Sequence, residues 1–121
     1  MQFAEEDLAR LAQADEVEIE TRAASGEVHR TIIWIVVDGG EVFVRSVNGE
    51  RGRWYREAVA RPSVAIHVDG RRLAATARPA PDIDAVERTS LALERKYDND
   101  PGTAPMLRPQ VLATTLRLIP A

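Results

Sequence analysis

The chain has no cysteine among its 121 residues, so disulfide bridges and thiolate metal sites are both excluded. A reducing compartment suits such a protein best. The first residues are acidic where a signal peptide would be basic and then apolar, so we expect a cytoplasmic protein. Long apolar runs are also missing: the longest, residues 32–37, is far too short to cross a bilayer, and we expect no membrane association.

Histidine is scarce, which limits metal and acid–base chemistry. There are only two histidines. His29 lies beside a charged turn, and His67 points to the opposite face of its strand from Ile66 and Val68. We interpret both as ordinary surface or edge residues. No cluster of histidine and carboxylate has metal-ligand spacing, so the sequence predicts no metal site.

Lysine is nearly absent: all but one of the 16 basic residues are arginine. The net charge is −3 and the pI is about 5.4, which argues against a protein that coats nucleic acid or an anionic membrane. One segment departs from this balance. Residues 45–61 carry five arginines against Glu50 and Glu57, so positive charge is concentrated there.

Hydrophobic periodicity predicts the secondary structure. Alternating apolar residues and glycine turns indicate strands at residues 17–19, 31–37, 41–46, 64–68, 73–77 and 112–118. Helical spacing indicates helices at residues 4–12, from residue 53 to before Pro62, and at residues 82–97. Asp84 with Glu87 is also compatible with a later start for the third helix.

These elements predict one domain over residues 1–121, mainly β with helices. Hairpin connections make the strands antiparallel, and a six-stranded antiparallel sheet in so small a chain tends to close into a barrel. We therefore expect a six-stranded antiparallel split barrel with three flanking helices. The strand at residues 31–37 is apolar on both faces, which predicts a cover outside the barrel, for which a second subunit is a candidate.

The arginine segment is typical of an anion site. Arg45 and Ser46 end a strand, a loop with Gly49 and Gly52 follows, and a helix begins near Arg53. Backbone amides at a helix start favour negative charge, and an arginine fork can hold phosphate with two hydrogen bonds. The alternative is a solvated helix surface whose arginines pair weakly with nearby glutamates. On that interpretation the neighbouring tryptophan and tyrosine pack in the core.

The order of these elements resembles a known superfamily. The stretch "VFVRSVNGERGRWYREAVARPSVAIHVDG", followed by "LAATA", is similar to the flavin and deazaflavin oxidoreductases of the FMN-binding split-barrel fold. The deazaflavin-dependent nitroreductase branch shows the same sequence of a small polar residue, a glycine loop, Trp-Tyr and an Ala-x-Pro stop. The whole chain, with "IIWIVVDGGEVFVRS" and "ATTLRLIP", resembles a small bacterial split-barrel family of unassigned function.

The resemblance implies a homodimer that binds FMN or deazaflavin at the subunit interface and an oxidoreductase acting on an unknown small molecule. The cofactor itself would transfer hydride, so no catalytic residue is needed. The implied cofactor-binding residues are Arg45, Ser46, Gly49, Arg51, Arg53, Trp54 and Arg56. Arg53 and Arg56 stand where the nitroreductase branch commonly has proline and asparagine.

Two other functions remain open. Residues 49–52 match the G-x-x-G loop with which KH domains clamp a nucleic-acid backbone, and nearby aromatics could stack on bases. That loop joins two helices in KH domains, whereas a strand precedes it here, so nucleic acid is the less favoured ligand. The third possibility is a dimeric split barrel with neither cofactor nor catalysis.

Overall fold

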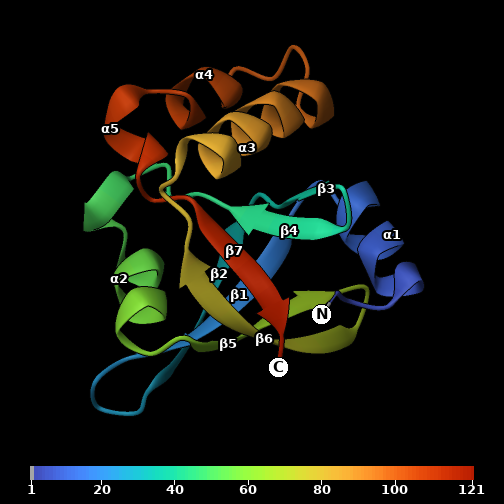
Figure 1. Cartoon of the computed structure of the whole chain (residues 1–121). Coiled ribbons are helices and arrows are strands. Elements are labelled where there is room, and N and C mark those ends of the chain that lie inside the picture. Colours follow the sequence, from blue (N-terminus) through green and yellow to red (C-terminus); the bar gives the residue numbers. More distant parts are fainter. Residues whose placement is uncertain (1) are drawn as a thin grey trace.

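A seven-stranded antiparallel sheet organises residues 2–121, which the computed structural model describes (Figure 1). The strands are β1 (Val17–Arg22), β2 (Val28–Ile33), β3 (Val36–Asp38), β4 (Glu41–Val44), β5 (Ser63–Val68), β6 (Arg71–Pro79) and β7 (Leu116–Pro120). The helices are α1 (Glu5–Gln13), the 3₁₀ turn η1 (Gly49–Arg51), α2 (Arg53–Ala60), α3 (Ile83–Lys96), α4 (Thr103–Met106) and α5 (Pro109–Leu112).

The strand order β2-β1-β5-β6-β7-β4-β3 forces the sheet to curl. Strands β2 and β3 are the two edges, yet only Trp34 and Ile35 separate them in the chain. Three Cα steps of about 3.8 Å allow at most about 11 Å between the end of β2 and the start of β3. The two edges must therefore meet at this crossover. The sheet closes there into a barrel, and the barrel is open where β2 and β3 are not paired with each other.

The apolar residues of the crossover segment divide between two cores. Ile33 and Ile35 belong to the cluster inside the barrel. Trp34 and Val36 pack instead against a second cluster, formed between the outer face of β3 and β4 and the helix α3. Ile32, also on the outer face, is 61% exposed. Helix α3 thus covers Trp34 and Val36 on the outer face of residues 31–37, whereas Ile32 stays exposed.

Helix α3 lies over β3 and β4 in Figure 1, while α1 and α2 lie at opposite sides of the sheet. It begins after Asp82, whose carboxylate accepts a bond from the Ala85 amide, so the earlier of the two predicted starts is confirmed. Arg88 then fixes the helix to the β3–β4 hairpin through Asp38 and Glu41, at 2.7 and 2.6 Å. None of the helices within residues 2–121 is both long and apolar enough to span a membrane.

The predicted fold class is confirmed, and three details of it were wrong. The strand expected at residues 31–37 is two strands, so the sheet has seven strands in the described residues rather than six. The strand expected at residues 41–46 ends at Val44. The stretch 112–118 contains the end of α5 and the start of β7, and together with α4 this raises the number of α-helices in the described residues from three to five.

The outer face of β1 carries an ion-pair network that should govern acid stability. Arg72 donates two hydrogen bonds to Glu20, at 2.9 and 3.1 Å, and His67 Nε2 lies 2.9 Å from the same carboxylate. The bonds from Arg72 and His67 lower the pKa of Glu20 to about 2. The carboxylate of Glu20 therefore stabilises the fold above its ordinary pKa.

We expect this contribution to disappear as the pH falls from about 4.5 to about 2, the interval between the unfolded and folded pKa values of Glu20. A Glu20→Gln variant should lose stability at neutral pH and show a shallower decline over that interval. Urea unfolding at several pH values measures both effects. Parallel stability curves for Glu20→Gln and the parent chain would contradict the assignment.

Candidate functional site

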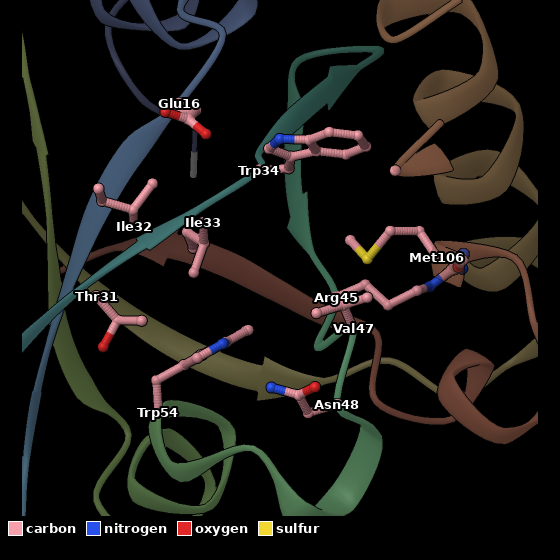
Figure 2. Close-up of a pocket in the computed structure, with 11 residues that line it drawn as sticks. Glu16, Thr31, Ile32, Ile33, Trp34, Arg45, Val47, Asn48, Trp54 and Met106 are labelled. Atoms are coloured by element: carbon pink, nitrogen blue, oxygen red, sulfur yellow. The ribbon is translucent and has the colours of Figure 1, made fainter. Parts of the chain in front are cut away.

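An open cleft of about 310 Å³ lies where the two edges of the sheet approach each other (Figure 2). Its lining is mainly apolar and comes from β2, the crossover, the end of β4, the following loop, α2 and α4. The lining residues are Glu16, Thr31, Ile32, Ile33, Trp34, Arg45, Val47, Asn48, Trp54, Gly102 and Met106. In Figure 2, Trp34 and Trp54 lie on opposite sides of the cleft.

Each tryptophan is held by a second aromatic ring. Trp34 stacks on Tyr97 with ring centroids 3.8 Å apart and planes 5° from parallel. Trp54, only 8% exposed, meets Tyr55 edge to face at 6.3 Å. Trp54 belongs to the barrel cluster, as the alternative of a solvated helix surface expected, and the same side chain also forms a wall of the cleft. Aromatic walls held in place suit a planar ligand.

The crossover itself is fixed by polar side chains from the end of α3. Lys96 Nζ donates to the carbonyl oxygens of Leu11 and Ile35, at 3.0 and 2.6 Å. The Tyr97 hydroxyl donates to the carbonyl oxygen of Asp15 at 2.8 Å. Burial lowers the pKa of Lys96 to about 8 and raises that of Tyr97 to about 12. These bonds satisfy backbone that lies outside the strand ladders and hold Trp34 at the cleft.

Arg45, implied above as a cofactor-binding residue, is buried. Its side chain is 2% exposed, and its guanidinium points away from the cleft. The Nε atom donates to Thr115 Oγ1 at 2.9 Å and Nη1 to Ser90 Oγ at 2.9 Å. Further bonds run to the carbonyl oxygens of Met106 and Val86, at 3.1 and 3.0 Å. These donors join the residue after β4 to α3, α4 and the residue before β7, so Arg45 lines the cleft while its guanidinium binds other parts of the chain.

Ser46 and the glycines shape the loop that follows. Ser46 is buried, and its hydroxyl donates to the carbonyl oxygen of Gly49 at 2.8 Å. Gly49 has a φ of +63°, which other residues adopt only with strain. A Cβ on Gly52 would clash with Ser46 Oγ. This packing makes a tight loop that places the next arginines on the surface, and Ser46 itself has no exposed hydroxyl to offer a ligand.

The three remaining arginines of the predicted site are exposed but are not gathered at one point. Arg53 Nη2 donates to Thr31 Oγ1 at 3.1 Å, which brings it to the mouth of the cleft. Arg51 faces a second open cavity, of about 430 Å³, together with Arg108. Val47 and Asn48 line both cavities, so the two adjoin across this loop. Arg56 is exposed on α2 and lines neither of these cavities.

Sequence reasoning missed two features of this region. Arg108 was not selected, because it lies 57 residues after Arg51 and only the folded chain brings them to one cavity. His29, interpreted as an ordinary surface residue, is half-buried with its Nδ1 atom 2.9 Å from Glu57 Oε2. Its partner is on another element, and the local sequence carries no sign of the contact.

The chain matches one protein-family model over residues 7–118, that of an uncharacterized protein conserved in bacteria, DUF2255. A comparison with curated proteins finds no match in sequence. The comparison with solved structures finds many similar folds at low sequence identity, so these matches show the fold alone.

Three of these structures illustrate the range of proteins that share the fold. The conserved hypothetical protein Rv2991 from Mycobacterium tuberculosis has a TM-score of 0.76 and 16% identity, covering 98% of this chain and 81% of that protein. An F420 reductase has a TM-score of 0.65 and 17% identity, with coverages of 93% and 91%. HutZ, the heme storage protein from Vibrio cholerae, has a TM-score of 0.68 and 14% identity, with coverages of 100% and 92%.

Proposed function

The chain belongs to the DUF2255 family of uncharacterized bacterial proteins, and from that premise we propose that it binds a flavin or deazaflavin cofactor and acts as an oxidoreductase. The observation that carries the proposal is the apolar cleft with two tryptophan walls, with Arg53 bonded to Thr31 at its mouth. The chain also has the fold of an F420 reductase, although that likeness concerns the fold only.

The cleft suits the ring system of such a cofactor. Its volume of about 310 Å³ lies at the lower end of the range for ligand pockets, roughly 300–1,000 Å³. A planar tricyclic ring can lie between apolar walls, with the polar groups of Thr31 and Asn48 close to its edge. The cleft has no room for the whole cofactor, so a phosphorylated tail has to extend towards the loop.

Arginines beside the cleft provide two places for that tail. Arg53 stands at its mouth, and Arg51 with Arg108 lines the adjoining cavity beyond Val47 and Asn48. An arginine fork matches phosphate oxygens and stays charged at any pH of interest. We assign the phosphate of FMN, or the acidic tail of a deazaflavin, to these arginines, and we assign Arg45 and Ser46 to the frame of the cleft.

A second copy of the chain is the proposed cover. Ile32 and Val47 line the cleft and are 61% and 47% exposed, so an apolar rim faces outward. Burying such a rim against a second copy stabilises a dimer and would also shield a bound ring from water. On this account the protein is a homodimer with the cofactor near the subunit interface.

The protein has only to bind and orient the cofactor, which supplies hydride transfer when bound. Fixed aromatic walls orient the ring, and the rim of Ile32 and Val47 would exclude water from it once a second copy covers that rim. Within residues 2–121 we assign no acid, base or nucleophile to the reaction. The substrate on this account is a small molecule.

Equilibrium titration with FMN and with F420 tests the proposal. We expect binding of at least one of them, with a change in cofactor absorbance, and an Arg53→Ala variant that binds roughly 10-fold more weakly, the loss of one charge-assisted bond. Riboflavin, which lacks the phosphate, should bind the variant and the parent chain equally.

A matched control is Arg78→Ala, which removes an exposed arginine from the outer face of β6. It should bind both cofactors like the parent chain. A protein that takes up neither cofactor would support the scaffold without cofactor or catalysis. Binding of RNA in place of both cofactors would support the nucleic-acid module.

A further inference from the structure

Arg53 and Glu57 lie one helical turn apart on α2, a spacing at which opposite charges can pair along a helix. They do not pair here. Arg53 donates to Thr31 Oγ1 at 3.1 Å, and no carboxylate oxygen within residues 2–121 lies at ion-pair distance from its guanidinium. The carboxylate of Glu57 is instead bonded to other side chains, and Arg53 stays at the mouth of the cleft.

The side chains of His29 and Thr21 contact the carboxylate of Glu57 at hydrogen-bond distance. Glu57 is 9% exposed, and its Oε1 atom accepts a hydrogen bond from Thr21 Oγ1 at 2.7 Å. His29 Nδ1 lies 2.9 Å from Glu57 Oε2, and His29 Nε2 lies 2.7 Å from Glu27 Oε1. Ionised carboxylates only accept hydrogen bonds, so each ring nitrogen donates where it faces one. The geometry therefore favours the positively charged imidazolium.

We propose that His29 is a positioning residue: by occupying Glu57 it keeps Arg53 at the mouth of the cleft as an anion-binding group. When the imidazolium loses its proton, Glu57 becomes an uncompensated carboxylate one turn from Arg53 and attracts its guanidinium away from Thr31. The inference deepens the proposed function, because it names what controls the arginine assigned there to the cofactor phosphate.

The charged groups around His29 decide the direction of the pH dependence. Glu57 and Arg53 face it from α2, Glu27 faces it from the turn before β2, and β1 contributes the neutral Thr21. The bonds to Glu57 and Glu27 raise the pKa of His29 above its ordinary value, and Arg53 opposes them. The affinity for an anion is thus highest below about pH 6.5 and falls as the pH rises through the raised pKa of His29.

The pKa of Glu57 is shifted in the opposite direction, downwards. Burial of Glu57 by itself would raise the pKa of its carboxyl, but the bonds from Thr21 and His29 outweigh burial and lower it. The carboxylate thus stays ionised throughout the range in which His29 titrates. Glu27 is exposed and can turn into solvent when the histidine becomes neutral. The competition for Glu57 then lies between Arg53 and a neutral ring.

Sulfate is the probe for the test, because its charge stays constant near neutral pH. Its binding can be followed through the NMR signal of Arg53 Nε, assigned with an Arg53→Lys variant. In the parent chain we expect sulfate to bind about 5- to 10-fold more weakly at about pH 9 than at about pH 6. The Arg53 signal should also titrate together with the ring nitrogens of His29.

Three variants separate positioning from general structural damage. His29→Gln keeps a hydrogen-bond donor without the charge, and it should bind sulfate weakly at both pH values. Glu57→Gln leaves Arg53 without a carboxylate to turn to, so it should bind sulfate tightly at both. His67→Gln removes the other histidine, which also contacts a glutamate but on the outer face of the sheet, and should match the parent chain.

Sulfate affinity that does not change with pH in the parent chain would overturn the inference. The same conclusion would follow if His29→Gln kept the tight binding of the parent chain at about pH 6. The test uses no flavin, so it is distinct from the test of the proposed function. A chain that ignores FMN but shows the sulfate pattern keeps the positioning role of His29, and FMN binding with pH-independent sulfate affinity removes it.

Discussion

Replacing Arg45 with alanine is expected to lower the free energy of unfolding by about 3–5 kcal/mol, the combined cost of buried acceptors left without a donor and of the cavity that the side chain leaves. The variant leaves the acceptors at Val86, Met106, Thr115 and Ser90 without their donor and opens a cavity between β4 and the helices. Urea unfolding followed by circular dichroism measures the loss.

Two further variants make the result specific. Arg45→Lys keeps a positive charge but cannot present donors to four acceptors in a plane, so we expect a loss of about 2 kcal/mol. Arg51→Ala removes an exposed arginine six residues later and should change stability by less than about 0.5 kcal/mol. If Arg45→Ala and Arg51→Ala unfold at the same urea concentration, the buried network does not exist in solution.

A second large effect is expected at Tyr97, which holds the crossover between the two edges of the sheet. Tyr97→Ala removes the ring stacked on Trp34 and the hydroxyl bonded to the carbonyl oxygen of Asp15. We expect a loss of about 3–5 kcal/mol in unfolding free energy, as for other buried aromatic residues truncated to alanine. Differential scanning calorimetry would measure it as a lower melting temperature.

Tyr97→Phe is the matched control for that experiment. It keeps the stacked ring and removes only the hydroxyl, so the expected loss is about 1 kcal/mol. Cofactor binding should survive in Tyr97→Phe, because Trp34 keeps its support. Equal stability of the two variants would mean that the stack of Tyr97 on Trp34 contributes nothing to stability.

The sequence predicted which faces of the crossover segment are buried, but not that the segment is two strands. Alternation placed Ile33 and Ile35 on one side and Trp34 and Val36 on the other, and the two cores confirm that division. The break depends on pairing with distant partners: Ile33 is opposite Val17, and Val36 is opposite Phe43. Residues 34 and 35 include no glycine or proline to mark it.

Arg45 shows that a correct pattern can be given the wrong meaning. The alternation of residues 42–46 places Arg45 on the same face as Phe43, which is fully buried beneath α3. That shared face was a signal of burial, but arginine is rarely buried, and the residue was instead expected to bind an anion. Its acceptors come from residues 41 to 70 positions away, and only the fold brings them together.

The most direct test of the proposed cofactor site uses the two tryptophans of the chain. Both line the cleft, so its walls carry the only indole N–H groups in the sequence. On addition of FMN or F420, we predict that the NMR signals of both Trp34 and Trp54 shift and saturate together. Binding that leaves both indole signals unmoved would contradict the account, because the cofactor would then lie outside the cleft.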